Sequence, residues 1–553
     1  MKRLYQEFVD ETFGPNGEVV RFRAKELESF NFAYDVVDRL AADQPEKLAM
    51  LWCNEAGDER RITFGDMKRE SDRAASFFQT MGIGLGDPVL LILKRHFEFW
   101  YCIIGLHKIG AIAVPATNQL MVKDIVYRCN AAFIKAIVCT ADGTIASLID
   151  EALPECPTVC ARVLVRGQRA GWLTFEEGMA AAPAFAKPAP DRLPGVRDVM
   201  LMYFSSGTTG MPKMVAHNYL YPLGHVPTAV YWQAVNPNGL HLTISETGWA
   251  KSMWGKLYGQ WLAEAAIFTY DYDRFHADAI LKLFAKYGIT TLCAPPTIYR
   301  FLIKEDLTKY DLSSLEHTVI AGEALNPEVF AQFQRLTGQK LMEGFGQTET
   351  TLAVGTLKWM EPKPGSMGKP SPGYDVRIVD EDGNTLAPGE VGEIVIATGE
   401  FTPAGLLIGY HRDEERTQQA WHDGLFHTGD TAWADEDGYL WYVGRQDDII
   451  KSSGYRIGPF EVESVLMEHP SVLECAVTGV PDPVRGQLVK ATVVLTAGTQ
   501  ASDALAHELQ EYVKTHTAPY KYPRVIEFVP ELPKTISGKI RRKEIRQKDE
   551  EAK

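Results

Sequence analysis

A short apolar run that ends in a glycine-rich loop constrains the fold of this chain more than any other feature. Residues Val199–Phe204 predict a buried strand, and the segment Ser205–Lys213 that follows it is made mostly of glycines and small hydroxyls before its lysine. Glycines let a backbone approach an anion closely, and N–H groups, hydroxyls and a lysine can then donate to phosphate oxygens. Two residues separate the last glycine from Lys213, so the segment departs from the P-loop pattern of nucleoside triphosphatases. We therefore expect a phosphate-binding loop at the end of a sheet strand, rather than a flexible surface loop.

Strand and helix patterns alternate on both sides of this loop. Before it, apolar strands such as Pro88–Leu93 are followed by helical patterns such as Phe97–Ile109. After it, strands at Ile289–Cys293 and Thr318–Ala321 precede a helix that Asn326 caps. Alternation of this kind implies βαβ units in a parallel sheet.

The last part of the chain changes character. Residues from about Asp375 to Val443 are β-rich, with turn signals between the strands, and the final hundred or so residues follow a compact βαββα pattern. A chain of 553 residues is also longer than one hydrophobic core supports. We therefore predict an α/β fold with two domains. Residues 1–445 would form a large N-terminal domain of layered α/β subdomains with a small β-rich part, and residues 446–553 a small, mobile α+β domain.

Composition excludes several classes of protein. The net charge of −15 argues against general nucleic-acid binding, which needs a basic face, but it allows a local basic site for an anionic ligand. The eight cysteines form no Cys-x-x-Cys pair and mostly lie beside apolar residues, so we expect buried free thiols in a reducing compartment. No run of 18 apolar residues and no secretory or transit pattern is present. These features predict a cytoplasmic enzyme without a membrane span and leave its oligomeric state open.

A second glycine-containing segment, Glu343–Thr350, carries a hydroxyl at Thr348 and a carboxylate at Glu349. A hard oxygen ligand beside a phosphate site suits Mg²⁺. An acidic turn before a strand is the alternative, and the presence of the first loop favours the metal site. The segment Gly322–Leu325 follows a predicted strand and could line the same crevice, with an adenine against its backbone.

Two further segments contain charged residues. A carboxylate such as Asp430, close to Arg445, can accept hydrogen bonds from the two vicinal hydroxyls of a ribose, although an aspartate in an ordinary turn is the alternative. The segment Pro533–Lys539 carries a lysine on a glycine-containing loop that could reach a distant anion. By composition alone a solvated basic tail is favoured there, because residues 541–543 are all basic.

Taken together, and in their order along the chain, these five segments resemble the adenylate-forming superfamily over nearly the whole chain. That superfamily includes acyl-CoA synthetases, nonribosomal peptide adenylation domains and firefly-type luciferases. The chain is most similar to the medium-chain acyl-CoA synthetases, through four further segments: Ser245–Trp249, Ile449–Pro459, Pro481–Gly486 and Ala518–Arg524. The resemblance implies a carboxylic acid, ATP and CoA as small-molecule substrates, and Mg²⁺ as a cofactor.

The resemblance implies that all five segments bind ATP. The first loop would wrap the β- and γ-phosphates, and the second would line the adenine and the α-phosphate. The residues so implied are Ser205, Ser206, Gly207, Thr208, Thr209, Gly210, Met211, Pro212, Lys213, Gly322, Glu323, Glu343, Gly344, Phe345, Gly346, Gln347, Thr348, Asp430, Arg445 and Lys539. Three residues would be catalytic: Lys539 at the carboxylate and α-phosphate, Thr348 at the transferring phosphoryl group, and Glu349 on Mg²⁺.

The resemblance also implies a CoA site and a moving small domain. The CoA candidates are Gln119, Ser453, Gly454, Tyr455, Arg485, Lys514, Tyr522, Pro523 and Arg524. Arg456 would lie near the adenylate, and Asp447 would be the hinge about which the small domain swings.

For the acyl pocket, the resemblance gives candidates at Thr348, Arg456, Trp249 and Gly346. Acetyl-specific relatives place a tryptophan just before the Gln-Thr-Glu triplet, where this chain has Gly346, so we expect room for a longer, branched or aromatic acyl group. Trp254 and Tyr258 are further candidates, whereas Trp261 is expected in the ordinary core. Lys251 and Lys256 are expected at the surface.

The reaction implied is attack of a carboxylate on the α-phosphorus of ATP, loss of pyrophosphate, and attack of the CoA thiolate on the acyl-adenylate. The acid, with a pKa of about 4, is already ionised and needs no general base. The alternatives are loading of a carrier protein, a short-chain (acetyl or propionyl) CoA synthetase, a luciferase-like oxygenase and a nucleotide-binding regulator. The segment Tyr520–Arg524 and Lys514 favour CoA over a carrier protein.

Overall fold

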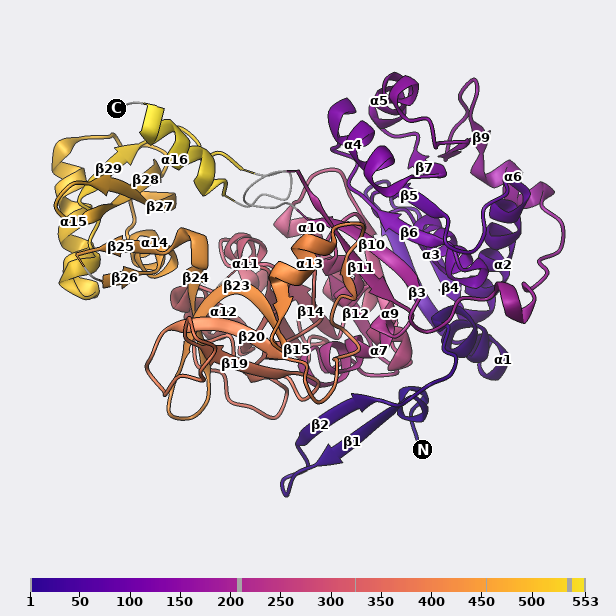
Figure 1. The fold of residues 1–553 in the computed structure, drawn as a ribbon, viewed down its shortest axis with the longest axis horizontal. Helices are drawn as coiled ribbons and strands as arrows, with labels where there is room; N and C mark the ends of the chain where they lie inside the picture. The colour runs from indigo at the N-terminus through magenta and orange to yellow at the C-terminus, as the bar shows by residue number, and fades with distance from the viewer. Residues whose placement is uncertain (1, 206–210, 324, 454, 535–539, 552–553) are drawn as a thin grey trace.

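The structure is a computed structural model that describes residues 2–205, 211–323, 325–453, 455–534 and 540–551. Some of the predicted site residues lie outside the described residues: Ser206, Gly207, Thr208, Thr209, Gly210, Gly454 and Lys539. Figure 1 shows a large body and a small domain at its upper left, which contains the C-terminal part of the chain. The α/β fold with a large N-terminal and a small C-terminal domain is thus confirmed.

The first large sheet has the strand order β21-β11-β10-β6-β5-β7-β8-β9. Its central strands are parallel, and β10, β11 and β21 pair antiparallel at one side. The bounds are β5 (Pro88–Ile92), β6 (Ile112–Pro115), β7 (Ala136–Thr140), β8 (Ala161–Val165), β9 (Leu173–Thr174), β10 (Val199–Ser205), β11 (Lys213–Asn218) and β21 (Gly409–Tyr410). The predicted strand before the glycine-rich loop is therefore β10.

The second large sheet has the order β18-β17-β16-β15-β14-β12-β13-β3-β4 and is parallel from β16 to β3. Its bounds are β3 (Leu48–Asn54), β4 (Glu59–Thr63), β12 (Leu240–Thr243), β13 (Ala266–Asp271), β14 (Thr291–Ala294), β15 (His317–Ala321), β16 (Leu341–Phe345), β17 (Val354–Gly355) and β18 (Lys369–Pro370). The parallel sheets predicted from alternating elements are present, and Asn326 caps its helix as expected, accepting from the Glu328 N–H at 2.7 Å.

Alternation along the strands explains why helices cover both faces of each sheet. In β5, Val89 and Leu91 point into one apolar core and Leu90 into another, since successive side chains lie on opposite faces. The core between the two sheets contains α2 (Phe64–Thr80), α3 (Glu98–Ile109), α7 (Tyr221–Val226) and α9 (Tyr258–Leu262). The outer faces are covered by α4 (Val122–Ala132) and α5 (Ile145–Ala152) on one sheet, and by α10 (Ala277–Tyr287), α11 (Pro296–Leu302) and α12 (Pro327–Thr337) on the other.

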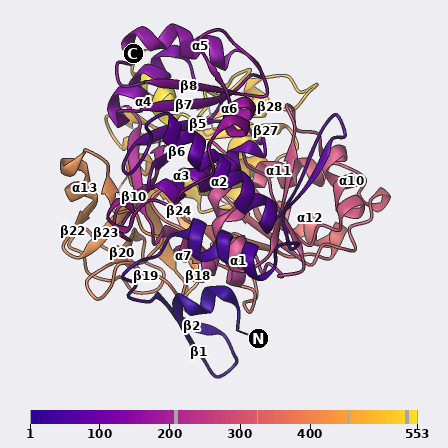
Figure 2. The ribbon, with the colours of Figure 1, turned by 90° about the vertical axis from the view of Figure 1, so that its right-hand side faces the viewer.

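Two antiparallel units complete the large domain. The β-rich part has the order β19-β20-β23-β22, with β24 beside β23, and a hairpin of β1 (Val9–Phe13) and β2 (Val19–Ala24) projects from the body in Figures 1 and 2. The bounds are β19 (Asp375–Val379), β20 (Gly392–Ala397), β22 (Trp421–His422), β23 (Leu425–Ala434) and β24 (Leu440–Arg445), with the helices α1 (Arg39–Asp43), α6 (Phe175–Ala181), α8 (Lys251–Gly255) and α13 (Glu414–Ala420) elsewhere in the large domain.

The small domain has its own sheet, in the order β26-β25-β28-β27 with β29 parallel to β28. Its elements are β25 (Ile450–Ser452), β26 (Tyr455–Ile457), α14 (Pro459–Glu468), β27 (Val472–Asp482), β28 (Gly486–Leu495), α15 (Asp503–His516), β29 (Val525–Phe528) and α16 (Arg542–Glu551). The short strands β25 and β26 and the helix α16 add to the predicted pattern. The sequence of α16 gives little sign of a helix, because it is almost entirely charged and Ile545 is its one buried apolar side chain.

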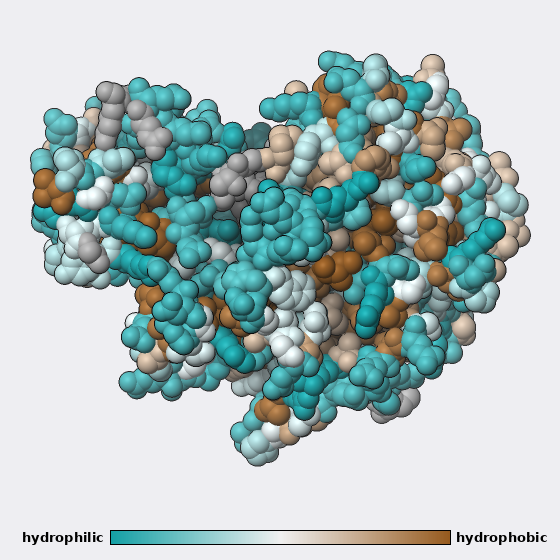
Figure 3. Space-filling view, viewed as in Figure 1, coloured by the Kyte–Doolittle hydropathy of each residue, from teal (hydrophilic) through white to brown (hydrophobic). Residues whose placement is uncertain are grey.

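The two domains meet along one side and separate along the other. The Asn326 amide donates to the Ser464 carbonyl at 3.2 Å, and Arg456 pairs with Glu381 at 2.6 Å across the boundary. Figure 3 shows a hollow at the upper edge, between the small domain and the N-terminal part of the large one. Within the described residues, no helix is both long enough and apolar enough to cross a bilayer.

Candidate active site

Lys213, Glu349 and Tyr410 form a hydrogen-bonded cluster where three segments meet. Lys213 begins β11, Tyr410 ends the neighbouring β21, and Glu349 lies in the turn after β16. The Lys213 Nζ is 2.6 Å from the Glu349 Oε1 and donates to the Tyr410 hydroxyl at 2.8 Å, and that hydroxyl donates to Glu349 at 3.0 Å. The residue predicted to bind phosphate and the one predicted to bind metal are therefore in direct contact.

The ionisation of Glu349 follows from this contact. Glu349 is only 4% exposed, and burial by itself would raise the pKa of its carboxyl. The Lys213 ammonium and the hydrogen bonds outweigh that effect and hold the pKa below its usual range. A buried, ionised carboxylate with a hard oxygen fits Mg²⁺, which binds through one or two carboxylates plus phosphate oxygens. In the described part of the chain, no group of three or more His, Cys, Asp or Glu gathers to hold a metal.

Asp430 and Arg445 come together as expected, on paired positions of β23 and β24. Asp430 is 4% exposed and accepts from the Tyr442 hydroxyl at 3.0 Å and from the Gln347 amide. The Arg445 guanidinium lies 3.5 Å from the same carboxylate and donates to the Thr428 carbonyl at 3.1 Å. Tyr442 was not predicted; its position three residues before Arg445, on the same short strand, is the signal that could have indicated it.

The turn Gln347–Glu349 joins these two groups. Gln347 contacts Asp430 at one end of the turn, and Glu349 contacts Lys213 at the other. Between them, the Thr348 carbonyl accepts from the His217 Nε2 at 2.8 Å. His217 lies on β11 four residues after Lys213, and burial lowers its pKa to about 4, so it donates as a neutral imidazole. The sequence reasoning missed His217.

Gly344 on β16 and Gly346, the residue directly after this strand, face two tryptophans. A Cβ at Gly344 would lie 2.7 Å from the Trp232 ring, and one at Gly346 would lie 2.5 Å from the Trp254 ring. The two indoles pack edge to face with centroids 6.1 Å apart. The Trp254 ring therefore lies directly beside Gly346, and the room that this glycine is expected to leave for the acyl group stays a prediction. Trp249 is half-buried, whereas Trp261 lies fully in the core as expected.

The expected adenine-binding strand ends are adjacent in the sheet. Residues Ile320 and Glu343 are paired on β15 and β16, and Gly322 follows with a φ of +110°, which glycine adopts readily. The Glu343 carboxyl is 4% exposed and accepts from the Leu325 N–H at 3.2 Å, and burial raises its pKa to about 8. Glu323 is exposed and accepts from the Thr297 hydroxyl at 3.4 Å.

The two lysines expected at the surface are not there. Lys256 is 1% exposed, and its Nζ donates to the Ser245 carbonyl at 2.7 Å. Burial, helped by the Arg95 cation, lowers its pKa to about 7. Lys251 is half-buried and reaches the Ala321 carbonyl, beside Gly322. Helices α8 and α9 fold back against strands of the second sheet and thereby bury Lys256. This contact joins distant segments, so the neighbouring residues in the sequence do not predict it.

The CoA candidates of the small domain gather at its surface. Ser453 accepts from the Arg485 guanidinium at 3.0 Å. Tyr455 is 50% exposed and stacks on Tyr520, with ring centroids 4.0 Å apart. Two cations lie over the Tyr522 ring, at 4.4 Å for Lys514 and 4.6 Å for Arg524, and Pro523 is buried beside them. Tyr520 is the residue that sequence reasoning did not single out, although it lies within the Ala518–Arg524 segment.

Two predicted residues, Gln119 and Arg456, lie away from these groups, and a third, Asp447, lies at the edge of the Asp430 group. Gln119 is exposed in the loop after β6, in the large domain. Arg456 faces Glu381 instead of the Asp430 group. Asp447, the predicted hinge, is 41% exposed between β24 and β25, with its carboxylate 3.8 Å from the Arg445 Nε. Their roles stay predictions.

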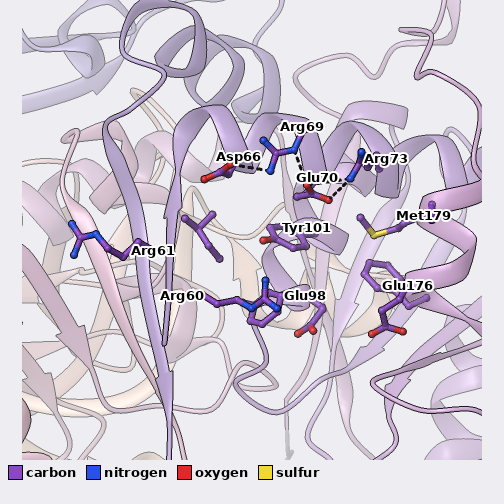
Figure 4. A pocket seen from close by; sticks show the side chains of 14 residues that line it. Arg60, Arg61, Asp66, Arg69, Glu70, Arg73, Glu98, Tyr101, Glu176 and Met179 are labelled. Atoms are coloured by element: carbon purple, nitrogen blue, oxygen red, sulfur yellow. Dashed lines mark hydrogen bonds and ion pairs between the residues drawn. The ribbon is translucent and has the colours of Figure 1, made fainter. Parts of the chain in front are cut away.

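Two cavities differ in their relation to this site. One of about 200 Å³ is lined by Met211, Pro212 and Lys213 at the end of the predicted phosphate loop, and by Arg412 and Arg416. The other, of about 450 Å³, lies between β4, α2, α3 and α6 and contains none of the predicted site residues. Figure 4 shows two of its arginines, Arg69 and Arg73, paired with acids of the same helix. We therefore place the site at the first cavity and the Gln347–Glu349 turn.

A family model described as "AMP-binding enzyme" matches residues 37–410, and one described as "AMP-binding enzyme C-terminal domain" matches residues 461–539. The chain belongs to the AMP-binding enzyme family. The first match covers the motifs from Gln119 to Tyr410, and the second covers Arg485 to Lys539. The predicted superfamily is thus confirmed.

Relatives within this family are similar over almost the whole chain. The human "Acyl-coenzyme A synthetase ACSM3, mitochondrial" is 41% identical over 94% of this chain and 90% of its own length, and the human "Acyl-coenzyme A synthetase ACSM5, mitochondrial" is 42% identical over 94% and 91%. Among solved structures, the anthranilate CoA ligase AuaEII in complex with anthranoyl-AMP has a TM-score of 0.86 and 28% identity, covering 95% of this chain and 98% of that one. A benzoate CoA ligase from Burkholderia xenovorans LB400 has a TM-score of 0.81 and 27% identity, covering 94% and 100%.

Proposed function

We propose that the protein is an AMP-forming acid–CoA ligase. It would convert a medium-chain, branched or aromatic carboxylic acid to its acyl-CoA through an acyl-adenylate, releasing AMP and pyrophosphate. One observation carries this proposal: the Gln347–Glu349 turn joins the Lys213–Glu349 ion pair to the Asp430–Arg445 group. A cation for phosphates and a carboxylate for ribose hydroxyls thereby lie on either side of one turn, in a relative of acyl-coenzyme A synthetases.

In the first step, the bound carboxylate attacks the α-phosphorus of ATP and pyrophosphate leaves. Because the acid is already ionised, the protein has to position the reactants and neutralise charge. We assign phosphate binding to Ser205–Lys213 and a contact with the transferring phosphoryl group to Thr348. Lys539 would bridge the carboxylate and the α-phosphate, and Gly322–Glu323 and Glu343–Gly346 would border the adenine.

Glu349 is the residue we assign to Mg²⁺, together with phosphate oxygens of ATP. The metal would supply positive charge at the phosphates. Lys213 and Tyr410 now satisfy this carboxylate, so Lys213 has to turn from Glu349 toward the phosphates when the nucleotide binds. A bound Mg²⁺ would supply the positive charge that Lys213 now supplies to Glu349, and this would avoid the cost of an unpaired buried carboxylate.

In the second step, the CoA thiolate attacks the acyl carbon of the adenylate and AMP leaves. We propose that the small domain, from residue 446 onward, rotates about Asp447 between the steps. Support comes from the sheets, because β24 ends at Arg445 in one sheet and β25 begins at Ile450 in another. Rotation would exchange the Lys539 loop for the Ser453–Tyr455 face, and Gln119 would meet CoA from the large domain.

The class of acid is proposed from the relatives and from the two tryptophans near Gly344 and Gly346. Two of the solved relatives are ligases of anthranilate and benzoate, which are aromatic acids, and the buried rings of Trp232 and Trp254 lie beside Gly344 and Gly346. A medium-chain substrate would place the enzyme in fatty acid metabolism. A cytoplasmic location stays a prediction, since the human relatives are described as mitochondrial.

The test is a screen of acids from C2 to C12, branched acids and benzoate, measuring AMP release and acyl-CoA formation with Mg²⁺, ATP and CoA present. We expect both products with medium-chain, branched or aromatic acids, and weak activity with acetate. Pyrophosphate release without any acyl-CoA would favour loading of a carrier protein. Absence of AMP formation with every acid would contradict the ligase assignment.

A further inference from the structure

Two anchored residues bracket the linker between the domains. Arg445 belongs to the large domain, since it pairs with Asp430 in the sheet and donates to the Thr428 carbonyl. Asp448 belongs to the small domain: its carboxylate is 9% exposed and lies 2.5 Å from the Arg546 guanidinium. Gln446 and Asp447 are the residues between these anchors. A rotation of one domain against the other within the linker would therefore fall on this pair, which lies in a single 3₁₀ turn with Asp448.

The arginines that hold Asp448 come from α16, which begins three residues after Lys539. Arg542 lies 3.8 Å from Asp448 and forms a two-pronged pair with the Glu463 carboxylate at 2.8 Å. Glu463 lies on α14 and also accepts from the Val477 N–H of β27 at 2.7 Å. We call Asp448, Glu463, Arg542 and Arg546 the linker cluster; it joins the linker, α14, β27 and α16.

The linker cluster is balanced in charge, because its two carboxylates face two guanidinium groups. Burial by itself would lower the pKa of the Arg542 guanidinium, but Glu463 and Asp448 outweigh burial and raise it. Removing one partner would leave a buried carboxylate uncompensated, which is costly. The cluster therefore has a strong physical reason to stay intact while the linker rotates. Of the three basic residues that composition favoured as a solvated tail, Arg542 is held in this cluster, whereas Arg541 and Lys543 are exposed.

The two flanks of the 535–539 segment are fixed to the same body. Lys534 and Ile540 form a β-bridge, and the Lys534 Nζ pairs with Glu474 of β27 at 2.7 Å. Ile545 of α16 packs in an apolar cluster with Ala476 of β27. The base of the lysine-bearing segment is thus connected through α16 and the linker cluster to the residue that follows the pivot.

We propose that Arg542 and Arg546 are positioning residues for Lys539. Through Asp448 they make the base of the Lys539 segment and the end of the linker one rigid piece. Rotation at Gln446–Asp447 then delivers Lys539 to a fixed place instead of a range of places. The proposal rests on the proposed function, because it assumes that Lys539 acts in adenylate formation.

The test compares Arg546→Gln with Arg541→Gln in the full-length enzyme. Arg541 lies one residue before α16, is more than half exposed and pairs with Glu544, so it provides a matched loss of charge outside the linker cluster. For Arg546→Gln we expect adenylate formation to fall about 10- to 100-fold, since misplacement by about 1 Å can cost about 10²-fold. Thioester formation from supplied acyl-adenylate and the KM for ATP should each stay within about two-fold of the unmodified enzyme. Such a change is small beside the expected loss of adenylate formation. Arg541→Gln should match the unmodified enzyme in all three.

Arg546→Lys and amide hydrogen exchange separate positioning from a merely structural role. The lysine should restore part of the adenylation rate, and exchange in residues 540–551 should rise in Arg546→Gln but not in Arg541→Gln. If Arg546→Gln fails to fold, Asp448→Asn removes the same charge pair with little change of shape. Equal loss of both half-reactions, or equal effects of Arg541→Gln and Arg546→Gln, would overturn the positioning role. Absence of adenylation in the unmodified enzyme would instead reject the proposed function.

Discussion

The proposed site has a nucleotide side, where ATP would bind, and a thiol side, where CoA would bind. The two sides differ in how far their side chains are already held together by contacts within the protein. On the nucleotide side, Lys213, Glu349 and Asp430 come from separate strands and turns, and the two carboxylates are almost fully buried. On the thiol side, Tyr455 is half exposed and Lys514 pairs with Glu511 on its own helix. The first arrangement is fixed by sheet register. The second is an exposed surface of the small domain, which the proposed rotation would bring to the nucleotide.

This difference implies unequal consequences of mutation. Loss of a buried group on the nucleotide side leaves its partners without compensation, whereas loss of an exposed group on the thiol side exposes a little more surface to water. The predictions below test this difference between the two sides. The first concerns Lys539, which belongs to the small domain and would have to reach the nucleotide in the large one.

Lys539→Ala should have the largest effect. A preorganised charge at the reacting phosphate typically contributes about 10²–10³ in rate, so pyrophosphate release should fall by about that factor. Thioester formation from supplied acyl-adenylate should be largely retained, because the lysine has left the site by then. The two half-reactions are measured separately. Equal loss in both would contradict the rotation of the small domain.

Asp447→Pro should block the second half-reaction. Proline fixes φ near −65° and so removes one of the rotations available to the two-residue pivot. We expect pyrophosphate release to persist while acyl-CoA formation falls about 10²-fold or more, as the acceptor surface fails to arrive. Burst kinetics with CoA present would report this split. A fully active variant would remove the hinge assignment.

Glu349→Gln should lower adenylation about 10²-fold, because the amide can neither hold Mg²⁺ as a carboxylate does nor balance the Lys213 charge. The Mg²⁺ concentration needed for half-maximal rate should rise as well. Glu361→Gln is the control, since Glu361 is 75% exposed and pairs with Lys340 at the surface. An unchanged Mg²⁺ dependence in Glu349→Gln would assign the metal elsewhere.

Asp430→Asn should raise the KM for ATP about ten-fold, in line with the loss of a hydrogen bond to a charged group. The maximal rate should change less, since the 2′- and 3′-hydroxyls of the ribose take no part in the bonds that form and break at the α-phosphorus. AMP affinity measured by calorimetry should fall in parallel. Asp437→Asn, at an exposed position paired with Lys363, serves as the comparison and should behave like the unmodified enzyme.

Arg485→Gln should have the smallest effect, a rise of a few-fold in the KM for CoA, because exposed charges contribute about 1 kcal/mol or less. The KM for ATP and the pyrophosphate release without CoA should not change. The effect should shrink further at high salt, since exposed charges are screened. A loss near 10²-fold would mean that the thiol side is as preassembled as the nucleotide side.

The sequence predicted well those features that are written locally. The strand before the phosphate loop, the Asn326 cap and the change of pattern near residue 445 depend on neighbouring residues, and all three match the observed elements. The meeting of Asp430 with Arg445 followed from motif order and is realised by the register of β23 and β24. The roles of these residues rest on the resemblance and still await the experiments above.

The features that escaped prediction depend on contacts between distant segments. The burial of Lys256 depends on how α8 and α9 fold beneath the strands of the second sheet. The pairing of Arg542 with Glu463 depends on α16 returning to α14 across 79 residues of chain. Basic residues near a chain end resemble a solvated tail until the acids that neutralise them are located in space.

The contact between Gly346 and Trp254 has a consequence for how the acid preference of such an enzyme can drift. Introducing a large residue at position 346 would collide with the Trp254 ring and with the Thr351 carbonyl, which lies 2.4 Å from where a Cβ would sit. A smaller residue at 254 would have to come first, or together with it. A smaller residue at 254 removes only the ring contact, so a larger residue at 346 also needs the backbone at Thr351 to move.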